Sequence, residues 1–130
     1  MKYICLSYLG PINWETMSES EQKASMEEFF AWEADLRKKG HIISGEGLQS
    51  ARNAKTLRFR KGKVAITDGP YAETKEQIAG FWIIEARDLN QAIELMSRNP
   101  AVRGGAIEIR PAAEHAEMDC ERERRRATAK

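Results

Sequence analysis

Apolar residues recur along this chain with two different periods, which predict an ordered series of strands and helices. The predicted strands are residues 2–9, 41–48, 56–60, 63–67, 78–85 and 106–110. The two predicted helices begin at Ser18 and Asp88, because each opens a capping pattern, Ser-x-x-Glu or Asp-x-x-Gln. The apolar residues predicted to share one broad face of the first helix are Met26, Phe29, Phe30 and Leu36.

The order of these elements predicts the fold class. Without the hairpin at 56–67, the series strand, helix, strand, strand, helix, strand is the split βαβ pattern of a ferredoxin-like fold. Right-handed crossovers place both helices on one face of an antiparallel sheet. The sequence therefore predicts an α+β domain with an inserted β-hairpin and two helices on one sheet face.

Both faces of the predicted sheet carry apolar residues. In the first strand, Tyr3 and Cys5 point one way, whereas Ile4, Leu6 and Tyr8 point the other. The run Phe-Trp-Ile-Ile at 81–84 also supplies apolar side chains to both faces. A face that no helix covers needs another cover, and a second copy packed about a twofold axis would supply it. We therefore expect a homodimer formed through the sheet faces.

Composition narrows the function classes without naming one. The 130 residues suit one domain, predicted at 1–111, followed by a charged tail at 112–130 that is flexible or helical. A net charge of +1 gives no general argument for nucleic-acid binding, and no apolar run is long enough to cross a membrane. Cys5 and Cys120 make no metal-binding spacing, so neither a metal nor a cofactor is expected. With no secretory signal pattern, a cytoplasmic location is expected.

The loop between the fourth and fifth predicted strands concentrates ionisable residues. Asp68 opens a turn, and the ionisable residues that follow within the loop are Tyr71, Glu73, Lys75 and Glu76. Asp68 is either a catalytic carboxylate or a cap for its own turn, and local chemistry favours the cap. Glu73 and Lys75 either bind a polar ligand and transfer protons or solvate the loop. The site hypothesis places Asp68, Tyr71, Glu73 and Lys75 on one wall of a cleft, with Glu76 as a further ligand contact.

Three residues outside this loop are further candidates for ligand binding. His41 follows the first helix, where a protonated imidazole would offset the helix dipole, a role favoured over general base catalysis. Trp82 either floors a pocket or belongs to the core. Arg110 either pairs with the loop or lies at the dimer seam.

Residues 68–76, Asp-Gly-Pro-Tyr-Ala-Glu-Thr-Lys-Glu, resemble the signature of the DGPF subgroup of YCII-related proteins. Further matching motifs are Gly-Glu-Gly-Leu at 45–48 and Gly-Ala-x-Glu-x-Arg-Pro at 105–111, so the resemblance spans about residues 2–111. Tyr71 stands where Phe is usual, which keeps the ring and adds a hydroxyl.

The resemblance implies a dimeric α+β barrel of ferredoxin-like protomers, in a family whose activity is largely unassigned. Some relatives resemble enzymes with a His/Asp pair in the cleft, but the matching position of the first helix here holds Phe29. This departure argues against transferring that pair. Members also occur beside extracytoplasmic-function sigma factors, which implies a possible sigma-factor association.

Three classes of function remain open from the sequence. The protein is a small-molecule binding module or accessory regulator, an enzyme using acid–base chemistry from Asp68, Glu73 and Lys75, or a structural dimerisation unit. A water-filled cleft lined by the 68–76 loop would favour the first two classes, and a sealed interior would favour the third.

Overall fold

A computed structural model describes residues 1–9, 17–72, 74–113 and 115–128, with the backbone alone described for 115–120. The strands are β1 (Lys2–Leu9), β2 (Ile42–Gly47), β3 (Lys55–Arg60), β4 (Lys63–Asp68), β5 (Gln77–Glu85) and β6 (Gly105–Pro111). The α-helices are α1 (Glu19–Lys38), α2 (Leu89–Ser97) and α3 (His115–Thr128), and the 3₁₀ turns are η2 (Ala51–Asn53) and η3 (Pro100–Arg103).

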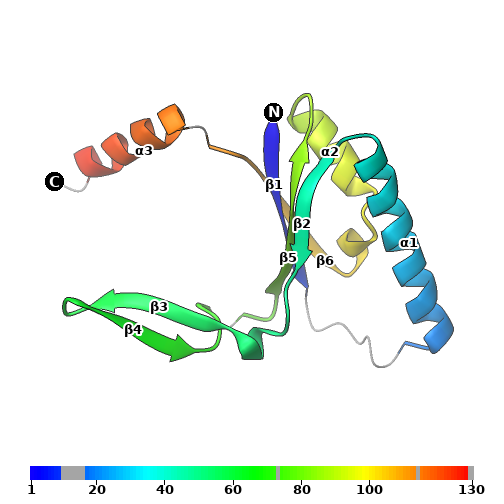
Figure 1. Cartoon of the computed structure of the whole chain (residues 1–130), viewed down its shortest axis with the longest axis horizontal. Coiled ribbons are helices and arrows are strands. Elements are labelled where there is room, and N and C mark those ends of the chain that lie inside the picture. Colours follow the sequence, from blue (N-terminus) through cyan, green and yellow to red (C-terminus); the bar gives the residue numbers. More distant parts are fainter. Residues whose placement is uncertain (10–16, 73, 114, 129–130) are drawn as a thin grey trace.

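Four strands form an antiparallel sheet in the order β2-β5-β1-β6. This order brings β5 between β1 and β2, as a split βαβ unit requires. Helices α1 and α2 cover the same face of the sheet (Figure 1). The predicted α+β, ferredoxin-like fold with an inserted hairpin is therefore confirmed.

Local signals fix where both predicted helices begin. The Ser18 hydroxyl accepts a hydrogen bond from the Glu21 backbone N–H at 3.2 Å, and the Asp88 carboxylate accepts one from the Gln91 N–H at 2.8 Å. After α1 the chain turns at Gly40, whose φ of 79° suits glycine. The capping patterns of the sequence therefore correspond to real caps.

The core lies between the sheet and these two helices. Its buried apolar side chains include Tyr3, Cys5, Trp32, Leu36, Ile42, Trp82, Ile84, Ala92, Leu95 and Met96. The prediction for α1 was partly wrong, because Met26 and Phe30 are exposed whereas Trp32 is buried. The buried stripe follows Trp32 and Leu36, four residues apart, and Phe30 lies to one side of it.

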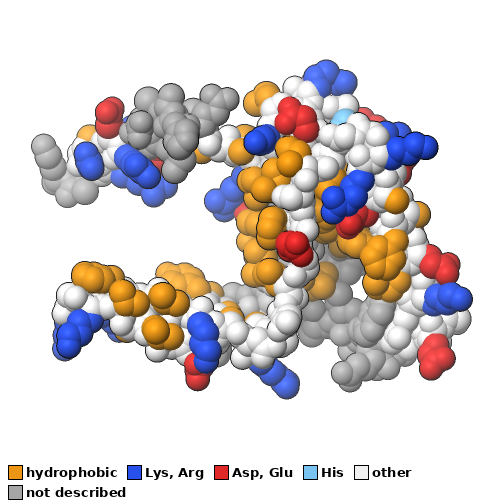
Figure 2. Space-filling model, viewed as in Figure 1, with side chains coloured by type: hydrophobic (Ala, Val, Ile, Leu, Met, Phe, Trp, Pro, Cys, Tyr) orange, Lys and Arg blue, Asp and Glu red, His pale blue; other side chains and the backbone are white. Residues whose placement is uncertain are grey.

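The opposite face of the sheet carries apolar side chains at its centre, and none of the helices in the described residues covers them. We call this surface the open face and define it by Ile4, Leu6, Tyr8, Phe81 and Ile83, all partly exposed. Ile4 pairs with Ile83 and Leu6 with Phe81, so these side chains share one side of the sheet. Figure 2 shows apolar side chains gathered along this side of the sheet.

Two appendages extend away from the body of the molecule (Figure 1). Strands β3 and β4 form a separate two-stranded sheet, joined by a turn in which Lys61 and Gly62 both have positive φ, 51° and 77°. Helix α3 extends from the other end of the body, and its side chains from 121 to 128 are exposed.

Candidate functional site

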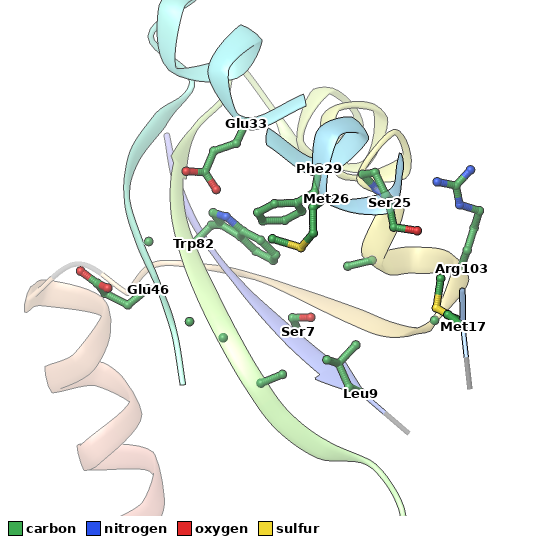
Figure 3. A pocket seen from close by; sticks show the side chains of 17 residues that line it. Ser7, Leu9, Met17, Ser25, Met26, Phe29, Glu33, Glu46, Trp82 and Arg103 are labelled. Carbon is green, nitrogen blue, oxygen red and sulfur yellow. The ribbon is translucent and has the colours of Figure 1, made fainter. Parts of the chain in front are cut away.

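A pocket of about 710 Å³ lies between α1, the sheet and the η3 turn (Figure 3). It opens on the side of the sheet that carries the helices. Phe29 and Met26 approach it from α1, and Trp82 from β5. Its size falls within the usual range for small-molecule sites, and its lining is mainly apolar.

Small residues in the sheet create this hollow. Gly45 and Gly47 of β2 and Gly80 of β5 all line the pocket. A Cβ at Gly45 would lie 2.8 Å from Trp82 Cδ1, and one at Gly80 would lie 2.9 Å from a backbone carbonyl oxygen. A Cβ at Gly47 would meet nothing within 4 Å. Gly45 and Gly80 therefore allow close packing, whereas Gly47 leaves free space.

The aromatic floor of the pocket is held in place by its neighbours. The ring of Trp82 lies 6.1 Å from that of Phe29 and 5.6 Å, edge to face, from that of Trp32. The Trp32 indole N–H donates to the Leu95 carbonyl oxygen at 3.1 Å, which ties α1 to α2 beneath the floor. The floor is thus preorganised to receive a flat apolar group.

One largely buried polar residue, Ser7, faces the pocket. Ser7 of β1 is only 4% exposed, and its hydroxyl makes no hydrogen bond to any described residue. Figure 3 shows this hydroxyl among the pocket side chains. The Ser7 hydroxyl can both donate and accept a hydrogen bond, so it offers a ligand in the pocket a polar contact that no described residue uses.

Two of the three charged residues that line the pocket have ion-pair partners, and the third, Glu46, has none among the described residues. Glu33 contacts Arg37 at 3.2 Å, and Arg103 contacts Glu28 at 2.5 Å. Within the described residues no cluster of His, Cys, Asp and Glu side chains is placed to hold a metal ion. The pocket therefore offers apolar contact and hydrogen bonding rather than a strong net charge.

Cys5 does not supply a nucleophile to this site. The thiol is buried in the core, and this desolvation raises its pKa to about 11. It does not line the pocket, and near neutral pH it stays protonated.

The described residues of the 68–76 loop lie outside the pocket. Asp68 forms an exposed ion pair with Lys55, and the exposed Tyr71 ring lies 4.8 Å from the Arg58 guanidinium carbon. The other two described residues named as candidates, Lys75 and Glu76, are also exposed. Glu73 is outside the described residues. A catalytic or binding role for these loop residues stays a prediction.

The remaining predicted residues occupy three different places. Trp82 lines the pocket and is also buried, so both readings of this residue from the sequence hold structurally. His41 follows α1, with Nδ1 2.9 Å from the Glu85 carbonyl oxygen. Arg110 contacts Glu108 at 2.9 Å on β6, in register with Ile4 of the open face.

The fold and this site define a small α+β domain with one side suited to a ligand. The chain belongs to the YCII-related family, because the model of the YCII-related domain matches residues 1–115. A curated protein of Rhizobium meliloti (strain 1021), itself called uncharacterised, is 32% identical over 117 residues. That alignment covers 87% of this chain and 93% of the relative.

A solved structure also resembles the chain. It is 5-chloro-2-hydroxyhydroquinone dehydrochlorinase from Burkholderia phenoliruptrix AC1100, in complex with 2,5-dihydroxybenzoquinone. The alignment covers 89% of this chain and 97% of that one, with 15% identity and a TM-score of 0.48. Among the helices of the described residues, none has the length and apolar character needed to cross a membrane.

Proposed function

We propose that this protein is a small-molecule binding module whose site is the pocket between α1 and the sheet. The observation that carries the proposal is the hydroxyl of the largely buried Ser7, which makes no hydrogen bond to a described residue, together with a rigid aromatic floor in a hollow of about 710 Å³. Such a combination of apolar walls and one oriented polar group is typical of ligand sites.

The lining also limits the chemistry of the ligand. A planar ring fits against Phe29 and Trp82, and one hydroxyl or carbonyl group on it would meet Ser7. Glu33 and Arg103 already have ion-pair partners, so they add little attraction for a charged ligand. A neutral aromatic compound with one hydrogen-bonding group is the class that this pocket favours.

The test uses 2-naphthol as a neutral probe of this class and follows its emission anisotropy during titration with the protein. We expect one binding site per chain in the unmodified protein. Gly47→Leu fills the free space beside Gly47 and should abolish binding. Ala34→Leu adds a side chain of the same size at an exposed α1 position outside the lining and should leave binding unchanged. Equal binding by all three proteins would refute the proposed site.

We infer that two copies associate through their open faces into a dimeric α+β barrel. The support is the apolar character of the open face, which the helices of the same chain leave uncovered. Monomeric proteins rarely leave so continuous an apolar surface in water. Dimerisation alone, with no ligand, is the alternative function. A native protein whose pocket holds no small molecule would favour this purely structural role.

An enzymatic role based on the 68–76 loop is a second candidate, and it rests on the DGPF-like signature. The Asp68 carboxylate, paired with Lys55 at the hairpin base, would act there with Lys75 and Glu73 in acid–base chemistry. Accessory regulation beside sigma factors and a cytoplasmic location are proposals drawn from the family resemblance. Mass spectrometry of the protein under native conditions would reveal a co-purifying compound and favour the binding role.

A further inference from the structure

The β3–β4 hairpin has one apolar side that its own chain leaves uncovered. Leu57 pairs with Ile66 and Phe59 with Val64, so these four side chains share one side of the ribbon. They are between 59% and 74% exposed. The other side carries polar pairs such as Thr56 with Thr67. The ribbon is therefore amphipathic, although none of the described elements of the same chain packs against its apolar side.

Hydrogen bonds at its base join the two ends of the hairpin. The Gly69 N–H donates to the Ala54 carbonyl oxygen at 2.8 Å, and the Thr56 hydroxyl donates to the Gly69 carbonyl oxygen at 2.8 Å. A two-stranded ribbon is marginally stable in water unless its apolar side is packed. The projecting part of the hairpin therefore needs a surface that the body of this chain does not provide.

A second copy of this chain offers a surface that fits. Figure 2 shows the apolar side of the hairpin turned toward the space in front of the open face. We propose that the hairpin is an exchange arm, whose apolar side packs against the open face of a second copy. The inference rests on the proposed twofold association, and twofold symmetry would make each copy both give and receive an arm.

Charge supports this occupant. The hairpin has no acidic residue between 56 and 67, and its tip carries Arg60, Lys61 and Lys63. On β2, Glu46 is in register with Phe81 of the open face, is exposed, and has no ion-pair partner among the described residues. To form a specific interface, the two arms and the surfaces that they cover would need to bury at least about 1,200 Å² in total.

The test compares two neighbouring substitutions that add the same charge to opposite sides of the hairpin. Sedimentation equilibrium of the full chain should show Ile66→Glu weakening the dimer by at least about 100-fold, because each dimer would bury two carboxylates. Thr67→Glu lies on the polar side and should change the dimer constant by less than about threefold. Since neither side chain lies in the core, both variants should retain the circular dichroism of the unmodified protein.

A third and a fourth variant separate this inference from the association on which it rests. Phe81→Glu changes the open face itself and should also dissociate the dimer. In the fourth variant, Gly-Gly replaces residues 55–68, and this short link suffices because Ala54 and Gly69 are hydrogen-bonded to each other. This excision should weaken the dimer as Ile66→Glu does. If Phe81→Glu dissociates the dimer but Ile66→Glu and the excision do not, the exchange arm is refuted while the open-face dimer stands. An unmodified protein that sediments as a monomer at about 100 µM refutes both.

Discussion

Two glycines on one strand should respond in opposite ways to the same added methyl group. Gly45 and Gly47 lie two residues apart on β2 and both line the pocket. A methyl at Gly45 would lie 2.8 Å from Trp82 Cδ1 and 2.9 Å from the Phe81 carbonyl oxygen, both closer than a real Cβ approaches another atom. A methyl at Gly47 would meet nothing within 4 Å.

The magnitudes follow from these distances. Gly45→Ala must displace either the indole of Trp82 or the β5 backbone, and overpacking of this kind costs roughly 1–3 kcal/mol. Gly47→Ala meets no clash and reduces the freedom of the unfolded chain, so it should be neutral or stabilising by up to about 1 kcal/mol. Urea unfolding of the two variants and the unmodified protein measures these free energies.

A double substitution separates the two contacts at Gly45. Replacing Trp82 by Ala removes Cδ1 and Cγ, the two ring atoms that the new methyl meets, but leaves the Phe81 carbonyl oxygen in place. The cost of Gly45→Ala should therefore shrink in the Trp82→Ala background without vanishing, which a double-mutant cycle would measure. The packing account of the pocket is wrong if Gly45→Ala is as stable as Gly47→Ala.

Three further expectations concern the core thiol, the loop and the tail. Burial raises the pKa of Cys5 from 9.0 to about 11. The free energy of unfolding, relative to that of Cys5→Ala, should therefore be highest below pH 9 and fall by roughly 1.4 kcal/mol per pH unit between pH 9 and 11. Urea unfolding of both proteins across this range measures the difference, and a difference that does not change with pH would contradict the expectation. Asp68→Asn, which removes an exposed ion pair, should lower the free energy of unfolding by less than about 1 kcal/mol, and a larger loss would contradict the surface position of Asp68. Truncation after Pro111 removes α3, whose described side chains are exposed, and should lower the melting temperature by less than roughly 5 °C, as calorimetry would test.

The fold could be predicted from the sequence because its signals are local or topological. Ser18 and Asp88 indicated where the helices begin, because each side chain caps its helix by a hydrogen bond to the residue three positions further along the chain. The placement of both helices on one face of the sheet followed from the handedness of crossovers. The side of α1 that faces the core was harder to predict, since Phe30 and Trp32 are both large and apolar. Only packing against α2 decides which of the two is buried.

The pocket could not be predicted in the same way, because its residues form no motif. Ser7, Phe29, Gly47 and Trp82 come from three strands and a helix, and the fold alone brings them together. Two weak signals were present in the sequence. Ser7 is a polar residue in the alternation that turns Tyr3 and Cys5 toward the core, and the glycines of β2 interrupt a strand. Taken alone, a serine or a glycine in a strand has an ordinary structural explanation, and only the structure shows that these residues line the same hollow.

Strand β5 serves the two proposed roles with alternate residues. Gly80 and Trp82 line the pocket on the helical side, whereas Phe81 and Ile83 belong to the open face. Because successive side chains of a strand point to opposite faces, a ligand and a second copy would contact the same backbone without competing for the same side chains. A slip of one residue in the pairing of β5 with β1 would exchange the two sets and destroy both surfaces. The register of this central strand is therefore the structural feature on which binding and association would jointly depend.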